Sequence, residues 1–315
     1  MSALTELNHQ QISNVLQPYG LALDTFKLLS GGSENTNYCV STSSGDFVLT
    51  ICEQKSIQSC NHLAQLLDFL QASNFASSQC IKTTAGEAIS LWQQKAVILK
   101  SYLAGSIVKD IPNDLLTLLG QQLAHLHSLA APSYLPKNVS YGKEKFSQVS
   151  EYAAGSDFEH WLKMIANKVS QIDLDKLPKA LIHSDIFYNN IIIDEAQQRA
   201  TIMDFEEASY YYRVFDIGMI IIGTCFTGNQ LCLSKARALL AGYQSKISLH
   251  SIEVQSLQVF TAYAAAGTAY WRHMNYNFLN FDQAMTEHYK AMQDFADQAL
   301  AFAPNEFIEQ LGISQ

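Results

Sequence analysis

The residues with the clearest chemical potential lie in two short stretches near the middle of the chain. His183, Asp185 and Asn190 belong to HSDIFYNN (183–190), and Asp204 and Glu206 belong to IMDFE (202–206). When a hydroxyl group attacks the terminal phosphate of ATP, a carboxylate must lie beside the hydroxyl and oxygen ligands must surround Mg²⁺. Asp185 would orient the hydroxyl and accept its proton, while Asn190 and Asp204 would bind the metal ion. The two stretches therefore predict a phosphoryl-transfer site that uses ATP and Mg²⁺.

Each motif also has a plainer interpretation. HxDxxxxN alone is also found in capped surface loops, but a second acidic motif in the right order favours the kinase. Asp204 is expected to lie inside an apolar, strand-like run, in which a charge is costly unless it is paired or binds metal. Glu206 would reach the metal ion or its waters, or else pair with Arg213 as a structural carboxylate. His183 is predicted to hold the loop by hydrogen bonds rather than to take part in the chemistry.

The apolar pattern around these stretches predicts two lobes. Short buried strands are expected at 180–182, 191–193 and 201–203. The first part of the chain alternates in the manner of an antiparallel sheet, with strands at 25–30, 38–42, 47–52, 88–92 and 96–102 and helices at 4–16 and 59–72. The later pattern is helical, at 112–130, 148–170, 214–226, 234–244, 252–274 and 281–301. We therefore expect an α+β chain with a small sheet lobe, residues 1–102, and a mostly helical lobe, residues 103–315.

The loop between the first two strands has the composition of a phosphate-binding turn. Gly31 and Gly32 permit close approach of the backbone, and successive N–H groups can surround an anion. Ser33, Asn35 and Asn37 follow and add polar side chains. An ordinary hairpin loop is the alternative. The position of the loop ahead of the other motifs favours nucleotide binding.

Two longer stretches resemble small-molecule kinases. The first, 29–53, reads LSGGSENTNYCVSTSSGDFVLTICE and resembles homoserine kinases of the protein-kinase-like type. The second, 204–218, reads DFEEASYYYRVFDIG and resembles choline and ethanolamine kinases. Both groups belong to the aminoglycoside phosphotransferase and choline kinase superfamily, and the resemblance covers nearly the whole chain. It implies a bilobal protein-kinase-like fold.

The resemblance also implies roles for particular residues. Asp185 would be the catalytic base, Asn190 and Asp204 would bind Mg²⁺, and Asp216 would brace the catalytic loop. The segment after the sheet would contact adenine through backbone groups of Ser101 and Leu103.

One position departs from the protein-kinase pattern. Thr50 stands where the phosphate-binding lysine of the VAIK strand belongs, and the helix expected at 59–72 has no glutamate in its first part to pair with such a lysine. The homoserine kinases carry the same VLT strand, so this departure does not indicate a dead enzyme. We hypothesise that Lys55, just past the strand, supplies part of the missing charge; a solvated surface lysine is the alternative.

The acceptor is the least determined part of the prediction. L-homoserine is the leading candidate, and an amino acid needs a cation for its carboxylate and acidic groups for its ammonium. Arg272, among aromatic residues in GTAYWRHMNYNF (267–278), is the candidate cation. Tyr210 would line the acceptor pocket, although aromatic runs more often pack in the core. Choline, ethanolamine or an aminoglycoside are the alternative acceptors, but the segment after Asp216 lacks the tryptophans that follow FDIG in choline kinases.

Two other classes of protein are less favoured. A nucleotide-binding pseudokinase would be expected to have lost Asp185 or Asp204, and both are present. A protein kinase would carry a peptide-docking segment, but only 11 residues separate Asp204 from Asp216. A small hydroxylated acceptor is therefore expected.

Composition is consistent with a cytoplasmic enzyme. With 315 residues, 48% of them hydrophobic, the chain can bury a sizeable core. A net charge of −9 and only four arginines argue against nucleic acid or an anionic membrane as a partner. The N-terminus has no signal-like pattern, and the longest apolar stretch is too short to span a bilayer. The six cysteines lack metal-site spacing and are expected to be buried thiols.

Overall fold

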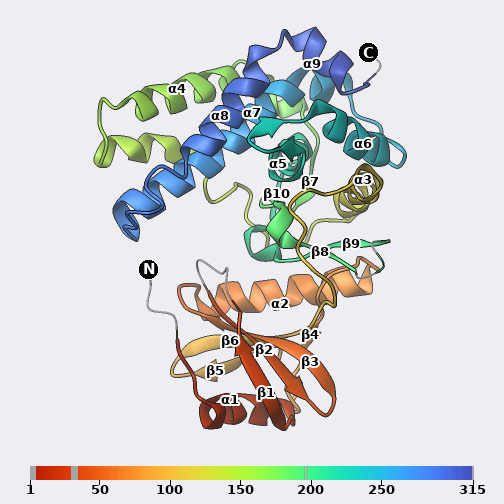
Figure 1. Cartoon of the computed structure of the whole chain (residues 1–315), viewed down its shortest axis with the longest axis vertical. Coiled ribbons are helices and arrows are strands. Elements are labelled where there is room, and N and C mark those ends of the chain that lie inside the picture. Colours follow the sequence, from red (N-terminus) through yellow and green to blue (C-terminus); the bar gives the residue numbers. More distant parts are fainter. Residues whose placement is uncertain (1–4, 30–34, 195, 197, 314–315) are drawn as a thin grey trace. The chain divides into compact units, whose positions relative to one another are not determined.

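The computed structural model describes residues 5–29, 35–194, 196 and 198–313. The chain divides into two compact units, residues 1–104 and 105–315, which are described one at a time. The first contains an antiparallel sheet with two helices, and the second is mostly helical (Figure 1). The α+β class and the bilobal, kinase-like organisation predicted from the sequence are confirmed.

The sheet of the first unit is antiparallel throughout. Its strands run in the order β1-β2-β3-β6-β4, and β5 also pairs with β6. The bounds are β1 Leu23–Leu28, β2 Asn35–Thr42, β3 Gly45–Cys52, β4 Cys80–Ile81, β5 Ser90–Trp92 and β6 Lys95–Ser101. The sequence predicted the five longer strands and missed β4, because a strand of two residues has no periodic pattern to detect.

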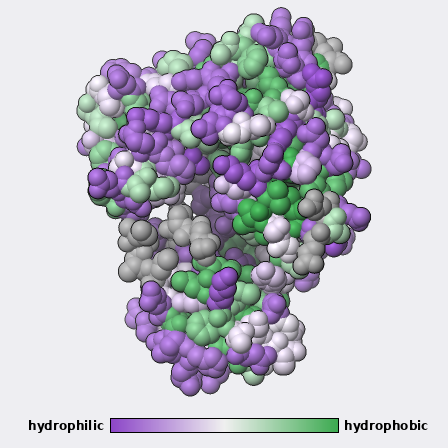
Figure 2. All heavy atoms as spheres, in the orientation of Figure 1, coloured by the Kyte–Doolittle hydropathy of each residue, from purple (hydrophilic) through white to green (hydrophobic). Residues whose placement is uncertain are grey.

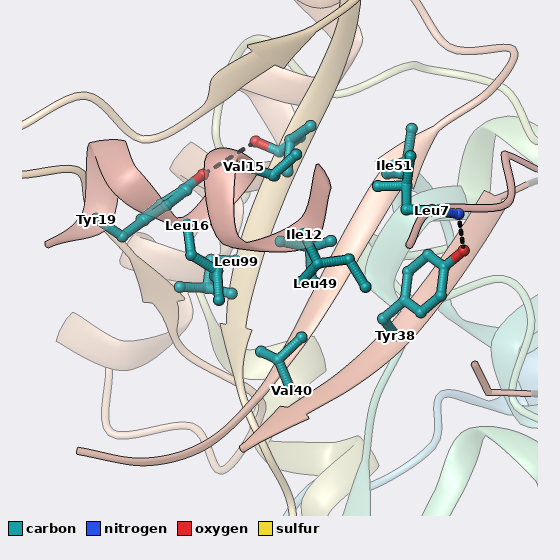
Figure 3. Packing of buried hydrophobic residues seen from close by; sticks show 11 residues of the cluster. Leu7, Ile12, Val15, Leu16, Tyr19, Tyr38, Val40, Leu49, Ile51 and Leu99 are labelled. Atoms are coloured by element: carbon teal, nitrogen blue, oxygen red, sulfur yellow. Dashed lines mark hydrogen bonds between the residues drawn. The ribbon is translucent and has the colours of Figure 1, made fainter. Parts of the chain in front are cut away.

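Two helices cover this sheet on opposite faces, α1 (His9–Leu16) and α2 (Ile57–Ala72) (Figure 1). Asn8 caps α1 through a capping box with Gln11, so the helix begins later than the sequence indicated. The apolar side of α1 packs on alternate residues of the central strands, which places one continuous core between helix and sheet (Figure 3). The Tyr38 hydroxyl, in this core, accepts a hydrogen bond of 2.8 Å from the Leu7 N–H, which ties the segment before α1 to β2 (Figure 3).

The described residues of the second unit form helices and three short two-stranded sheets. The helices are α3 Asn113–Ser128, α4 Asp157–Ser170, α5 Arg213–Thr224, α6 Leu233–Gln244, α7 Ser251–Met274, α8 Lys290–Ala301 and α9 Pro304–Gln310. The strands pair as β7 Lys179–Ile182 with β10 Ser209–Tyr212, β8 Ile191–Ile193 with β9 Ala200–Ile202, and β11 Phe226–Thr227 with β12 Gln230–Leu231. Every residue of α5 is buried, so this helix forms the centre of the unit.

Two helices differ from the sequence-based expectation. The helix predicted at 148–170 is a 3₁₀ segment, Lys143–Glu151, followed by α4. Gly155, at φ +73°, lies in the turn between the two, and Ser156 caps α4. The helix predicted at 281–301 begins only at Lys290. Before it, α7 continues into a π-helical turn, Asn275–Leu279, a feature that propensity does not reveal.

No helix in the described part of the chain is long and apolar enough to cross a membrane. On the face shown in Figure 2, hydrophilic residues cover most of the surface and hydrophobic residues gather in separate groups.

A buried ion pair joins the start of α5 to the first turn of α7. The Arg213 guanidinium donates to Glu253 at 2.6 and 2.5 Å, and the Glu253 side chain is fully buried. The bidentate partner of Arg213 is thus Glu253, a carboxylate that the sequence did not indicate. Sequence reasoning considered only the nearby acid, whereas the true partner lies 40 residues further along the chain.

Glu253→Gln is expected to lower the free energy of unfolding by about 3 kcal/mol, because it leaves the buried Arg213 without a countercharge. Urea unfolding of the variant and the wild-type protein measures this change. Glu287→Gln is the matched control: Glu287 pairs with Lys290 on the surface, and a change of about 0.5 kcal/mol or less is expected. Equal small losses in both variants would contradict a structural role for the buried pair.

Candidate active site

The HSDIFYNN stretch forms a loop between β7 and β8. Ser184, in this loop, has φ +75°, a conformation that is uncommon for residues other than glycine. Its N–H donates to Asp216 at 2.7 Å, its carbonyl accepts from the Tyr141 hydroxyl, and its side chain is fully buried. Backbone strain of this kind persists only where surrounding contacts maintain it, and it occurs often at functional sites.

Asp216 anchors the loop from the first turn of α5. Its carboxylate accepts hydrogen bonds from the N–H groups of His183 and Ser184, at 2.8 and 2.7 Å. It also lies 3.2 Å from Nε2 of His127 on α3, and Nδ1 of His127 is 2.9 Å from the Tyr243 hydroxyl on α6. A polar chain thus runs from α6 through α3 and α5 to the loop.

His183 connects the two motifs. Its Nε2 donates to the Met203 carbonyl at 2.9 Å, and its Nδ1 accepts from the Asp185 N–H at 3.2 Å. The ring is fully buried and packs against Phe205 at 4.6 Å between centroids. With both nitrogens engaged, His183 fixes the distance between the HSDIFYNN loop and the segment that carries Asp204.

Asp185 and Asn190 face each other across the loop. The Asn190 amide nitrogen donates to the carbonyl oxygen of Asp185 at 2.8 Å and to its carboxylate at 3.0 Å. The amide hydrogens of Asn190 are therefore used within the loop, and its amide oxygen is the atom that can bind a cation. The donor set at this end of the loop suits Mg²⁺, which prefers oxygen ligands.

Asp204 follows β9 by two residues and is exposed. The argument that a buried charge at Asp204 must be compensated is therefore wrong, because the apolar run ends at Met203. The backbone is the more informative feature: Asp204 has φ +67° and is followed by a 3₁₀ turn, Phe205–Glu207. Among the described residues no three His, Cys, Asp or Glu side chains gather as a metal site, so the candidate set remains the amide oxygen of Asn190 with Asp204 and Glu206.

The electrostatic environment of Asp185 is negative. Burial, together with the charges of Asp204 and Glu207, raises the pKa of Asp185 to about 7, although the Asn190 hydrogen bond and the charge of Arg272 act in the opposite direction. A cation near Asp204 would offset one of these negative charges and lower the pKa of Asp185. Binding of a cation at this position would therefore be coupled to the protonation of Asp185.

Arg272 lies in the last turn of α7, close enough to Asp185 to affect its pKa. Its guanidinium is 5.6 Å from the ring centroid of Phe187 and 3.4 Å from the His288 carbonyl. Within the described ranges it has no carboxylate partner at ion-pair distance. Burial lowers the pKa of Arg272, as expected for a guanidinium that is partly removed from water without a countercharge.

The three tyrosines of 210–212 form β10, which pairs with β7. Tyr211 and Tyr212 pack against Tyr263 and Phe260 in the core. Tyr210 is 38% exposed, and its described contacts are made by its backbone. The structure brings Asp185, Asn190 and His183 together but shows no contact between Tyr210 and Asp185.

The nucleotide-binding residues expected in the first unit are only partly described. Gly31, Gly32 and Ser33 lie outside the described residues, and Asn35 and Asn37 belong to β2. The Thr50 hydroxyl donates to the side-chain oxygen of Asn37 at 2.7 Å. At the position where protein kinases carry lysine, the side chain of this protein therefore makes a hydrogen bond between neighbouring strands of the sheet.

Three further residues that were expected to bind the nucleotide lie at or just after the ends of β3 and β6. Lys55 follows β3 and is half-buried. Ser101 ends β6 and its N–H donates to the Gln79 carbonyl at 2.9 Å, and Leu103 follows two residues later.

Sequence reasoning missed three residues around the loop. His127 carries the link from α6 to Asp216, and the Tyr141 hydroxyl donates to the Ser184 carbonyl. Glu207 accepts from the Ser140 hydroxyl and adds negative charge near Asp185. Of these three residues, only Glu207 could have been recognised from the sequence, because it directly follows Glu206 in the acidic motif.

A sheet unit, a helical unit and a braced HxDxxxxN loop followed by an exposed DFE turn define the class of this protein: it is a small-molecule kinase. The chain belongs to the phosphotransferase enzyme family, whose pattern matches residues 25–245. A homoserine kinase of Pseudomonas aeruginosa is 28% identical over 267 residues, 81% of this chain and 83% of that protein. A homoserine kinase of Caulobacter vibrioides is 26% identical over 275 residues, 84% and 86% of the two chains.

Solved structures share the fold at lower identity. A spectinomycin phosphotransferase in complex with ADP and spectinomycin has a TM-score of 0.68 and 17% identity, with 98% of both chains covered. A microcompartment-associated aminopropanol kinase has a TM-score of 0.71 and 16% identity, covering 98% of this chain and 99% of that one. The predicted membership of the aminoglycoside phosphotransferase and choline kinase superfamily is confirmed.

Proposed function

We propose that this protein phosphorylates the side-chain hydroxyl of L-homoserine with Mg²⁺ and ATP. The observation that carries the acceptor is Arg272, a partly buried guanidinium near Asp185 without a carboxylate partner in the described chain. A carboxylate on the acceptor would supply the missing countercharge and can accept two parallel N–H bonds from a guanidinium. The homoserine kinases of similar sequence support the same acceptor.

In the proposed mechanism Asp185 orients the acceptor hydroxyl and takes its proton as the new P–O bond forms. The phosphoryl group moves directly from ATP to the acceptor, with no covalent enzyme intermediate. Asn190 and Asp204 would hold Mg²⁺, with Glu206 reaching the ion or its waters; when bound, the ion neutralises charge on the phosphates. Asp216 and His183 keep the loop in position through their contacts with it.

On the acceptor side, residues of opposite charge would bind the two charged groups that the amino acid carries on its α-carbon. Arg272 would bind the α-carboxylate. The charge of Glu207 raises the pKa of Asp185, and the same negative charge would favour the binding of an ammonium group. Choline has no carboxylate for Arg272, so the charge pattern favours an amino acid over a quaternary amine.

The nucleotide would be bound by the first unit, through the 31–37 loop and backbone groups near Leu103. Lys55 is the proposed source of the positive charge that Thr50 does not supply. An unchanged KM for ATP in Lys55→Ala would remove Lys55 from this role.

The first experiment is an ADP-release assay with Mg-ATP and a panel of L-homoserine, choline, ethanolamine and several aminoglycosides. Saturable turnover on L-homoserine alone is expected. Turnover on an amino alcohol and not on homoserine would contradict the amino-acid proposal while keeping the kinase assignment.

Arg272→Met is expected to raise the KM for L-homoserine by about 10²-fold, because a charge-assisted bidentate contact is lost, and to leave the KM for ATP unchanged. Arg272→Lys should lie between this variant and the wild type, since lysine keeps the charge but not the planar fork. Arg237→Met is the control, because exposed Arg237 donates to the Gln310 carbonyl. An unchanged KM for homoserine in Arg272→Met would exclude Arg272 as the carboxylate ligand.

A further inference from the structure

Two cysteines face each other at the open end of the β11–β12 hairpin. Phe226 is paired with Leu231, and the Cys232 N–H donates to the Cys225 carbonyl at 2.8 Å. The register of the hairpin thus places Cys225 opposite Cys232, joined by this one hydrogen bond, while the Cys225 N–H donates to the Ile221 carbonyl of α5 at 2.8 Å. Gly228, at φ +60°, lies in the two-residue turn that closes the hairpin.

This pairing is compatible with a disulfide bond. Residues directly opposite each other on antiparallel strands have Cα atoms about 4.5–5.5 Å apart, and their side chains lie on the same face of the sheet. Disulfides usually join residues whose Cα atoms are about 5.5–6 Å apart. Cys225 and Cys232 could therefore be joined without a large movement of the backbone.

The two thiols differ in the way that attacking and resolving cysteines differ. Cys232 is half-buried and lies 3.2 Å from the Ser234 hydroxyl. Burial alone would raise its pKa, but hydrogen bonds from Ser234 and the Lys235 N–H hold the pKa of Cys232 below its ordinary value. Cys225 is fully buried, and burial raises its pKa to about 12. Cys232 is thus the thiol that would ionise and react first.

We propose that Cys225 and Cys232 are a modification site that closes to a reversible disulfide when a low-molecular-weight disulfide such as glutathione disulfide oxidises them. The Cys232 thiolate attacks one sulfur of the oxidant and releases one thiolate, leaving a mixed disulfide. The Cys225 thiol then loses its proton, attacks the Cys232 sulfur and releases the second thiolate. Two protein thiols are oxidised to one disulfide, and the oxidant is reduced to two thiols.

The hairpin contacts the catalytic loop. Phe226, the neighbour of Cys225, meets the ring of Tyr188 edge-on at 6.0 Å between centroids, and Tyr188 lies between Asp185 and Asn190. Gly223, two residues before Cys225, packs so closely on the loop that an added Cβ would lie 2.0 Å from the Ile186 carbonyl oxygen. A change of hairpin twist on disulfide formation would therefore reach the loop through direct packing.

The test uses the full-length protein, incubated with glutathione disulfide, treated with iodoacetamide to block remaining thiols, and digested for mass spectrometry. A Cys225–Cys232 cross-linked peptide is expected, and it should disappear after treatment with dithiothreitol. Cys232→Ser should abolish it. Cys39→Ser, which removes another half-buried cysteine, should leave it unchanged. Two alkylated thiols, or glutathione attached to Cys232 without the cross-link, would overturn the proposal.

Activity provides the second readout. Oxidation should lower kcat several-fold in the wild-type and Cys39→Ser proteins, with recovery in dithiothreitol, and should not affect Cys232→Ser. A cross-linked protein with unchanged kcat would overturn the link to the catalytic loop. The peptide measurement does not depend on the identity of the acceptor, so failure of the homoserine proposal and failure of this one are distinguishable.

Discussion

Asp185→Asn is expected to lower kcat by about 10²-fold or more and to leave ATP binding intact. Asparagine keeps the shape of the side chain and an oxygen that can accept from Asn190, but it cannot take a proton from the acceptor. The nucleotide-binding groups proposed here lie in the first unit, so their affinity for ATP should not fall. Steady-state kinetics and calorimetric ATP titration of the variant measure both quantities.

The matched control for Asp185→Asn is Asp173→Asn, which makes the same chemical change in a surface ion pair with Lys176. It should have wild-type kinetics. A kcat near the wild-type value in Asp185→Asn would remove Asp185 from the role of base. Loss of ATP affinity together with kcat would instead indicate a role in nucleotide binding.

Asp204→Asn is expected to reduce Mg²⁺-dependent phosphoryl transfer by about 10³-fold, because a carboxylate ligand that helps to neutralise several kcal/mol of developing charge is lost. Asparagine is the informative replacement because Asp204 has φ +67°, and asparagine tolerates this conformation far better than alanine does. The loss can then be assigned to the charge and not to the backbone. Turnover measured against Mg²⁺ concentration tests this prediction.

Glu206→Gln provides the comparison for Asp204→Asn in the same turn. If Glu206 reaches the metal ion only through water, its removal should raise the Mg²⁺ concentration needed for half-maximal rate and change the maximal rate much less. Full activity of Asp204→Asn at ordinary Mg²⁺ concentrations would contradict the proposed ligand set.

The HSDIFYNN loop could be predicted from the sequence because the pattern that marks it lies within a few consecutive residues. The strands on either side of HSDIFYNN are short apolar runs, and the residues between them are spaced by the length of one loop. The sheet of the first unit was likewise predictable from alternation. The same approach failed at β10, because three successive tyrosines show no alternation, although Tyr211 is buried and Tyr210 exposed.

The remaining features depend on contacts between residues far apart in the chain. Glu253 was not considered as a partner of Arg213, and His127 lies 89 residues from Asp216, with no motif to connect them. The exposure of Asp204 depends on where β9 ends, and a strand of three residues gives no clear end in the sequence. Such contacts follow from packing, which a single sequence does not encode in any local pattern.

The polar chain Tyr243–His127–Asp216 has a consequence for engineering. It supports the catalytic loop from α3, α5 and α6, whereas the proposed acceptor residue Arg272 belongs to the end of α7, next to the π-helical turn. In the proposed mechanism, the geometry of phosphoryl transfer and the choice of acceptor therefore depend on different parts of the helical unit. A library of variants confined to residues 273–289, which keeps Arg272 and its effect on Asp185, is therefore expected to change which alcohol is phosphorylated without altering the proposed base or the loop that carries it.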